Sequence, residues 1–139
     1  MQEYVAGFLF DDHGTQVALI EKNRPAWQAG KFNAIGGKIE HGEHRQSAMN
    51  REFKEEAGVE THWRHRFSLV RTEVYAVHFY SSFSTHHLDL VESQEDEPIV
   101  IHSVDPLPVN LIPNLRWIIP MILDNTILIP ETIYDIAGN

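Results

Sequence analysis

Residues 37–59 read GKIEHGEHRQSAMNREFKEEAGV, and this stretch indicates more about the fold than the rest of the chain. If residues 45–57 are helical, a rotation of about 100° per residue places the carboxylates of Glu52, Glu55 and Glu56 in one sector. Three like charges so close repel one another, and a bound divalent cation removes that penalty. Hard ions such as Mg²⁺ and Mn²⁺ favour oxygen ligands. The stretch therefore predicts a helix that carries a metal site.

An apolar sector lies beside the acidic one on the same helix. Met49, Phe53 and Ala57 occupy it, so the helix can bury one side while its carboxylates face a cleft. Gly58 follows as the residue type that commonly ends a helix. The two sectors together predict a helix fixed on a core and not a free surface helix.

The same stretch resembles the Nudix box, G-x5-E-x7-R-E-U-x-E-E-x-G-U, in which U is an aliphatic or large apolar residue. Every defined position is filled without a gap, by Gly37, Glu43, Arg51, Glu52, Phe53, Glu55, Glu56, Gly58 and Val59. An ordinary acidic surface helix would explain the glutamates, but not the glycines, the arginine and the first glutamate in register. The resemblance implies an α/β fold, the Nudix α/β/α sandwich with a mixed β-sheet between helices.

Size and composition predict one globular domain over residues 1–139. The apolar fraction is 42%, and the absence of cysteine excludes disulfides and thiolate metal sites. No leader-like segment opens the chain and no apolar run reaches bilayer length, so we expect a cytoplasmic protein with no membrane partner. A formal charge of −9 argues against a nucleic acid polymer as partner. Whether the protein is a monomer or a homodimer stays open.

Apolar, β-rich runs alternate with turn residues along the chain. We expect strands at residues 4–10, 16–21, 34–39, 63–71, 74–83 and 99–103, the first two joined as a hairpin by the turn at residues 11–14. Residues 23–33 and 84–97 read as polar loops, the second with some strand around residues 88–91, and residues 113–123 read as a second helix. Residues 126–139 are apolar but irregular, and the sequence assigns no role to the segment 125–139.

The Nudix resemblance implies hydrolysis of a nucleoside diphosphate linked to another moiety. By position in the box, Glu52 and Glu56 are the expected ligands of Mg²⁺ or Mn²⁺, followed by Glu55, and the backbone carbonyl of Gly36 commonly joins them in this family. Arg51 is expected to orient a box glutamate for catalysis. The box also implies an outer role for Glu43, which could hold waters around the metal or favour the helix N-terminus.

The general base stays open between two places in the chain. Members of the family use either a box glutamate, here Glu55 or Glu56, or a carboxylate from a distant loop. The acidic loop before the run at residues 99–103 offers Glu97 as the first choice and Glu95 as the second. A charge run of this kind is also typical of a solvated loop.

Two passages outside the box bear on the substrate. Residues 30–38 resemble the run before the box in MutT-like enzymes that clear oxidised purine nucleoside triphosphates, and residues 114–123 resemble the helix that walls their base pocket. The resemblance makes a nucleoside triphosphate, cleaved to monophosphate and pyrophosphate, the favoured small-molecule substrate. The predicted substrate-binding residues are Asn33, Lys38, Trp27, Asn114 and Trp117, with Phe32 as a further stacking surface. An acidic pair of some purine-specific members is replaced by Asn110 and Asn114, which leaves a preference for oxidised guanine open.

Other readings of the chain remain. ADP-ribose or dinucleoside polyphosphate hydrolysis would use the same box. The latter enzymes often place a tyrosine beyond the box, for which Tyr75 or Tyr80 could be mistaken. A non-catalytic nucleotide sensor of the same fold would typically carry a damaged box, whereas this box is intact. The nine histidines include the pairs His62/His65 and His86/His87, but neither pair forms a recognisable zinc motif, so surface or strand histidines explain them better.

Overall fold

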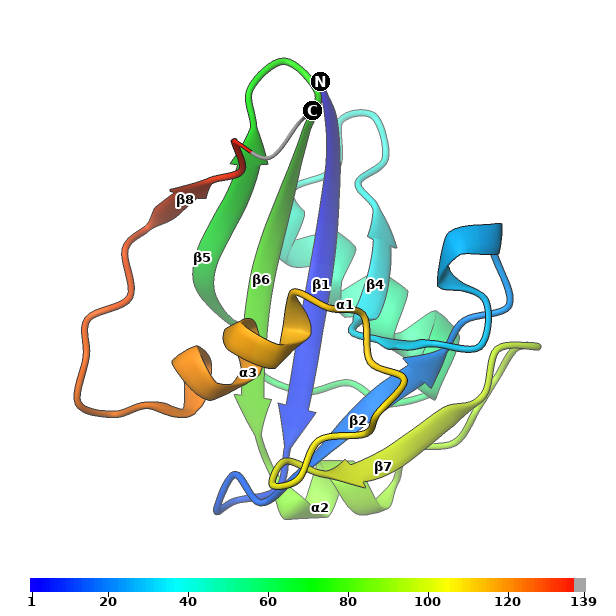
Figure 1. The fold of residues 1–139 in the computed structure, drawn as a ribbon. Coiled ribbons are helices and arrows are strands. Elements are labelled where there is room, and N and C mark those ends of the chain that lie inside the picture. The colour runs from blue at the N-terminus through cyan, green and yellow to red at the C-terminus, as the bar shows by residue number, and fades with distance from the viewer. Residues whose placement is uncertain (137–139) are drawn as a thin grey trace.

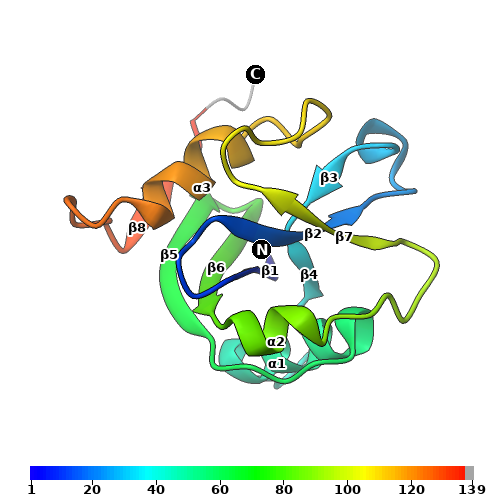
Figure 2. The ribbon, with the colours of Figure 1, turned by 90° about the horizontal axis from the view of Figure 1, so that it is seen from below.

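The computed structural model describes residues 1–136, in which a mixed β-sheet lies between helices on its two faces (Figure 1). The eight strands of this part of the chain are β1 (Gln2–Phe10), β2 (Gln16–Glu21), β3 (Phe32–Asn33), β4 (Ile35–Lys38), β5 (Arg64–Arg71), β6 (Tyr75–Phe83), β7 (Ile99–Ser103) and β8 (Thr132–Tyr134). The helices are α1 (Arg45–Ala57), α2 (Thr85–Asp89) and α3 (Leu115–Leu123), with a 3₁₀ turn, η1, at Ala26–Gln28. Figure 2 shows α1 and α2 on one side of the sheet and α3 on the other. The predicted α/β/α sandwich is confirmed.

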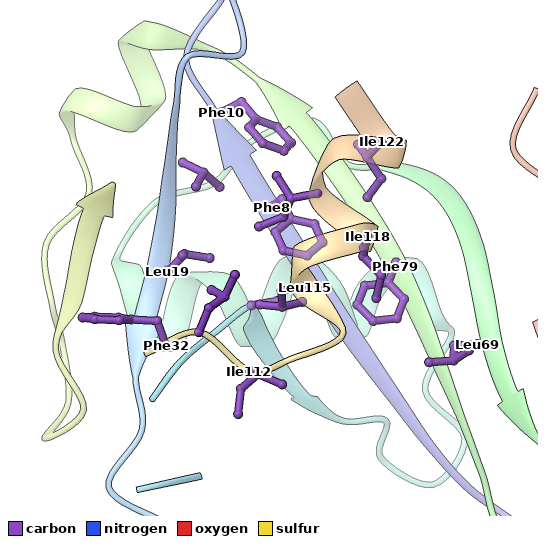
Figure 3. Packing of buried hydrophobic residues seen from close by; sticks show 14 of the residues in the cluster. Phe8, Phe10, Leu19, Phe32, Leu69, Phe79, Ile112, Leu115, Ile118 and Ile122 are labelled. Carbon is purple, nitrogen blue, oxygen red and sulfur yellow. The ribbon is translucent and has the colours of Figure 1, made fainter. Parts of the chain in front are cut away.

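Two apolar clusters hold the layers together, and the alternation of side chains along each strand divides residues between them. On β1, Phe8 and Phe10 belong to the cluster under α3, while Leu9 between them belongs to the cluster under α1. Figure 3 shows Phe8 and Phe79 of the sheet close to Leu115, Ile118 and Ile122 of α3. Each helix is therefore fixed to its face of the sheet by its own core.

Strand β1 is the centre of the sheet and changes its partner along one edge. It pairs in parallel with β6 from Gln2 to Phe10, and antiparallel with β4 from Tyr4 to Gly7. It meets β2 only at the turn, where Phe10 lies opposite Val17. The predicted hairpin is therefore right at its turn but wrong along its length, because β4 takes the place beside β1 that a continuous hairpin would give to β2.

The segment 32–38 joins the two diverging strands. Its first part, β3, pairs with β2 through Asn33 opposite Ile20, and its second part, β4, pairs with β1 through Ile35 opposite Gly7. Strand β7 covers the other edge of β2. The cavity described below is lined by residues of β1, β2 and this short segment, at the place where the two strands diverge.

Helix α1 begins and ends where the sequence predicts. The His44 side chain accepts a hydrogen bond from the backbone N–H of Gln46 at 3.2 Å, and Gly58 ends the helix in the left-handed conformation at φ 74°. The buried residues of the helix include Met49, Phe53 and Ala57, as the sequence predicts. This burial leaves Glu52 on the side that faces β4, where its carboxylate lies against Gly37.

Several predicted boundaries are corrected by the structure. Residues 88–91 are not a strand; α2 forms instead, because the Ser84 hydroxyl accepts from the N–H of His87 at 3.1 Å and Leu88 is buried under the sheet. The second helix begins at Leu115, two residues after the predicted start at Pro113. In the segment 125–139, β8 pairs with β5, which the sequence did not indicate, and residues 137–139 lie outside the described part. No helix within residues 1–136 has the length and apolar character needed to cross a membrane.

Candidate active site

Two adjacent glycines on β4 form one wall of the site. A Cβ on Gly36 would lie 1.9 Å from the carbonyl oxygen of Val5, so only glycine allows β4 to approach β1 this closely. A Cβ on Gly37 would lie 2.5 Å from the carboxylate carbon of Glu52. The Glu52 carboxylate of α1 therefore lies directly against the backbone of β4.

Arg51 joins three parts of the stretch 37–59. Its Nε and Nη2 donate to the two carboxylate oxygens of Glu43 at 2.8 and 2.9 Å, and its Nη1 donates to Glu52 at 3.0 Å. Its Nη2 also donates to the backbone carbonyl of Lys38 at 3.1 Å. The hydrogen bonds from Arg51 lower the pKa of Glu43 to about 2, and those to Glu43 raise the pKa of Arg51. This planar fork holds the loop, the helix and the end of β4 in one arrangement.

Glu52 and Glu56, one helical turn apart, form the acidic part of the site. Burial raises the pKa of Glu52 in spite of its hydrogen bond from Arg51. Burial, followed by the nearby charge of Glu95, raises the pKa of Glu56 to about 7. Partly buried carboxylates with raised pKa values indicate a place where negative charge is not fully compensated by the protein.

The acidic loop packs against the end of α1. The backbone N–H of Glu92 donates to the carbonyl of Ala57 at 3.1 Å, and that of Gln94 donates to the carbonyl of Glu56 at 3.0 Å. These bonds occupy carbonyls that the helix end leaves free, so the loop is anchored and not merely solvated. The anchor brings Glu95 close enough to act on the pKa of Glu56.

Glu97 is buried, with a side-chain exposure of 6%, and its oxygens are already engaged. It accepts from Lys22 Nζ at 2.9 Å and from the N–H of Asn23 at 2.6 Å. Burial alone would raise its pKa, but the hydrogen bonds from Asn23 and Lys22 outweigh it and the pKa is lowered. Glu97 thus fixes the chain after β2, and its place is next to the site and not among the residues that line the cavity.

A cavity of about 560 Å³ opens beside the glutamates. One part of its wall is polar and includes Lys22, Gly36, Gly37 and Glu56. The other part comes from the α3 face of the sheet and from the start of α3; its apolar residues are Ala6, Leu69, Val77, Phe79, Ile112 and Leu115. The cavity therefore extends from the acidic side of α1 across β1 to the space under α3.

Two asparagines from distant parts of the chain line this cavity. Asn33 donates to the Gln28 side chain at 3.0 Å and accepts from the N–H of Ala34 at 2.8 Å, so its orientation is fixed. Asn114 stands at the N-terminus of α3 but does not cap it. Its buried Oδ1 finds no hydrogen-bond partner among the described residues. An unpaired buried acceptor costs about 1–3 kcal/mol, which a ligand N–H could recover.

Comparison with known proteins identifies the family of this chain. The NUDIX domain family model matches residues 2–118. The chain belongs to the Nudix family. No curated protein sequence matches it. Nudix enzymes generally hydrolyse pyrophosphate bonds in nucleoside diphosphate derivatives and need divalent cations, and this chain is a Nudix hydrolase.

Solved structures of Nudix proteins share the fold. A MutT Nudix hydrolase from Burkholderia pseudomallei is 19% identical with a TM-score of 0.71, over 86% of this chain and 95% of that one. A MutT protein from Methanosarcina mazei Go1 is 18% identical with a TM-score of 0.68, over 86% and 91% of the two chains. The ORF135 protein of E. coli is 23% identical with a TM-score of 0.66, over 88% and 89%.

The Nudix box provides donors suited to a divalent cation. Glu52 lies against Gly37, and the backbone of Gly36 lines the cavity together with Glu56. Within residues 1–136, no three acidic or histidine side chains converge closely enough to complete a metal site alone. A hard cation would accept the missing ligands from a backbone carbonyl, water and substrate phosphate, as Mg²⁺ commonly does. The residues present therefore fit the group that the family needs.

Six predicted site residues do not line the cavity: Arg51, Glu52 and Glu97, described above, and Glu55, Lys38 and Trp117. The Glu55 side chain is half exposed, and its Oε2 lies 3.4 Å from Arg51 Nη1. Lys38 is exposed and contributes its backbone carbonyl, not its side chain, to Arg51. Trp117 is 44% exposed and lies beside Phe67, with ring centroids 6.4 Å apart. The structure brings Trp27, Asn33 and Asn114 to the cavity, but not Lys38 or Trp117.

The structure also adds residues that the sequence did not single out. Lys22, at the end of β2, and Tyr4, on β1, both line the cavity. The alternation of β1 could have indicated Tyr4, because it shares a face with Ala6 and Phe8. Nothing in the sequence marked Lys22.

The histidine pairs noted in the sequence each have a member that forms a hydrogen bond with a hydroxyl group. His65 contacts the Ser68 hydroxyl at 3.0 Å, and His87 contacts the Thr61 hydroxyl at 2.7 Å.

Proposed function

We propose that this Nudix hydrolase converts a purine nucleoside triphosphate, oxidised or not, to the monophosphate and pyrophosphate with Mg²⁺ or Mn²⁺. The observation that carries the proposal is the cavity, which joins the acidic side of α1 to an apolar wall that holds two asparagines. The phosphates would lie at Glu56 and the glycines of β4, and the base would lie under α3. We expect the enzyme to act in the cytoplasm on free nucleotides, as a monomer or homodimer.

The residues of the chain would bind the cation, orient the substrate and deprotonate the attacking water. Glu52, Glu56 and the carbonyl of Gly36 would hold the cation, with Glu55 as a further candidate ligand, while Arg51 keeps Glu52 in place. A divalent cation supplies charge neutralisation at the phosphates and activates the attacking water. Lys22, whose Nζ is oriented by Glu97, would meet a phosphate oxygen at the polar end of the cavity.

A glutamate of α1 is the better candidate for the general base. Glu97 was the first choice in the acidic loop, but its oxygens already accept hydrogen bonds from Lys22 and Asn23. Glu56 lines the cavity itself, with Glu55 next to it on the helix. We therefore propose that Glu97 acts in catalysis through Lys22 and that Glu56 or Glu55 receives the proton.

The purine preference rests on the two asparagines. A purine edge offers both a donor and an acceptor, and an amide can match both. Asn114 Oδ1 has no partner among the described residues, so a base N–H would remove an unpaired acceptor. Asn33 is held by Gln28 and Ala34, so it would bind a base without the cost of ordering its side chain.

The test is a nucleotide panel with Mg²⁺ and with Mn²⁺, with the products separated by ion exchange. We expect monophosphate and pyrophosphate from purine triphosphates. Asn114→Ala is expected to lower kcat/KM for purine triphosphates by about 10- to 100-fold and to affect pyrimidine triphosphates much less. Asn33→Ala should act in the same direction.

Two results would contradict this proposal in different ways. A uniform loss for purines and pyrimidines would remove the base-reading role of the asparagines. AMP and ribose phosphate from ADP-ribose, with no turnover of triphosphates, would replace the substrate class. Binding of nucleotides without any turnover would favour a sensor.

A further inference from the structure

Tyr75, the first residue of β6, lines the cavity. Its hydroxyl forms a hydrogen bond with Asp135, in the segment that follows β8. We propose that Asp135 is a positioning residue that holds the Tyr75 ring as a fixed wall of the nucleotide cavity. The carboxylate itself would not touch substrate. This inference rests on the proposed function, because it concerns how the same cavity accepts its nucleotide.

The bond between the two residues spans the edge of the sheet. The Tyr75 hydroxyl donates to the Asp135 carboxylate, and the backbone N–H of Asp135 donates to the carbonyl of Val70 at 2.8 Å. Strand β5 lies between β6 and β8 in the sheet, so the Tyr75 side chain extends across β5 to reach its partner. Figure 1 shows β8 beside β5 at this edge.

The other side of Tyr75 belongs to the cavity. Tyr75, Val77 and Phe79 alternate along β6 and all line it, as does Leu69 of β5. These residues share the face on which α3 lies, and the apolar end of the cavity is the proposed place of the base. The Tyr75 ring therefore stands at the edge of the surface that a base would contact.

The hydrogen bond selects one orientation of this ring. A tyrosine has three staggered χ1 positions, and only a ring directed across β5 reaches Asp135. In either of the other positions the hydroxyl would lose this bond, and the ring would no longer be held in its place beside the cavity. Burial, and then Asp135, raise the pKa of Tyr75 to about 12, so its hydroxyl remains a donor at neutral pH.

Strand β8 provides the support for Asp135. It pairs in parallel with β5 through Thr132, Ile133 and Tyr134, opposite Ser68, Leu69 and Val70. The C-terminal segment, to which the sequence assigned no role, thus contacts a residue of the cavity wall, Tyr75, through the Asp135 side chain. Its contribution would be to the shape of the cavity and not to the chemistry at α1.

A double-mutant cycle tests this role. The variants are Tyr75→Phe, Asp135→Ala and the two combined, assayed with the triphosphate that the wild type cleaves fastest. We expect each single change to raise KM about three- to tenfold with kcat within about twofold, because the loss is in binding and not in the transition state. The double variant should be no worse than Asp135→Ala alone, since that change already removes the hydrogen bond between the two side chains. Asp135→Asn retains an acceptor oxygen and should restore KM in part.

A matched control and four outcomes decide the question. Tyr134→Phe changes an exposed tyrosine next to Asp135 and should leave KM unchanged. Additive effects of the two single changes, or a lower melting temperature with unchanged KM in Tyr75→Phe, would overturn the inference. If the wild type cleaves the triphosphate and KM is unchanged in all variants, this inference is overturned and the proposed function is not. No turnover by the wild type overturns the proposed function and this inference with it.

Discussion

At the scale of single residues, the site contains two kinds of carboxylate. The negative charge of one kind is compensated by a cationic side chain of the protein, and that of the other kind is not fully compensated. Glu43 belongs to the first kind, because the Arg51 fork lowers its pKa to about 2. Glu56 belongs to the second, because burial and Glu95 raise its pKa to about 7. One glutamate of the box thus holds the arginine, and Glu52 and Glu56 are the ones that we propose as ligands of the cation.

The raised pKa of Glu56 predicts the pH dependence of stability without metal. Its folded pKa lies above the ordinary value of 4.5, so the metal-free fold should lose stability as pH rises from about 4.5 through 7. The loss should be on the order of 1–2 kcal/mol after a discount for partial exposure. Thermal unfolding in EDTA at a series of pH values measures it.

Glu56→Gln is the matched change for this measurement. It removes the charge with little change in shape, so the slope between about pH 5 and 7.5 should flatten, and activity should fall by orders of magnitude. Added Mg²⁺ should raise the melting temperature of the wild type more at high pH than at low pH. An equal slope in wild type and variant, or more than about half of the activity retained, would contradict the assignment.

At the scale of elements, the site depends on how closely α1 and β4 approach β1. The two glycines of β4 serve different contacts: Gly36 meets the backbone of β1, and Gly37 meets the Glu52 side chain. Backbone cannot move aside without disturbing the strand pairing, whereas a carboxylate can move. Substitution of Gly36 should therefore mainly reduce stability, whereas substitution of Gly37 should mainly reduce activity.

Gly36→Ala and Gly37→Ala separate these contacts. A methyl group 1.9 Å from the Val5 oxygen should force β4 from β1 and destabilise the fold strongly, by about 2 kcal/mol or more. A methyl group on Gly37 should displace Glu52 and reduce activity and metal affinity with a smaller loss of stability. Gly30→Ala, at φ 80° and with no atom within 4 Å of the added Cβ, measures the cost of backbone strain without a steric clash. Equal stability losses at Gly36 and Gly37 would show that the argument from contacts is wrong.

At the scale of the whole molecule, the cavity joins parts of the chain that are far apart in sequence. Lys22 is held by Glu97 across 75 positions, and Tyr75 is held by Asp135 across 60. The polar and apolar ends of the cavity are thus each fixed by a buried or partly buried long-range contact. Such contacts should affect stability and substrate binding together.

Glu97→Gln tests the supporting role that this long-range contact suggests. The lowered pKa of Glu97 means that its contribution is present above the ordinary value of 4.5 and is lost as pH falls below it. The variant should lower the melting temperature by about 3–8 °C, raise KM, and reduce kcat by less than about tenfold. Glu92→Gln, on the exposed part of the same loop, should be silent. A fall in kcat of about 100-fold or more without a change in stability would instead support Glu97 as the general base.

The sequence alone determined the family box, the helix over residues 45–57 and the apolar residues that fix it. These depend on contacts within one or two helical turns, and the spacing of Glu52, Glu55 and Glu56 is visible without a fold. The same locality explains the αL end at Gly58. Where a feature depends on neighbours in sequence, the pattern was sufficient.

Only the tertiary structure decided which residues share the cavity. Lys22 and Tyr4 enter it because β1 and β2 diverge, and Trp117 stays outside because α3 buries Leu115, Ile118 and Ile122 instead. The helix over residues 85–89 and the pairing of β8 with β5 also depend on long-range burial. Spacing along the chain carries no information on which strand takes the place beside β1, since that choice is made by packing across the whole sheet.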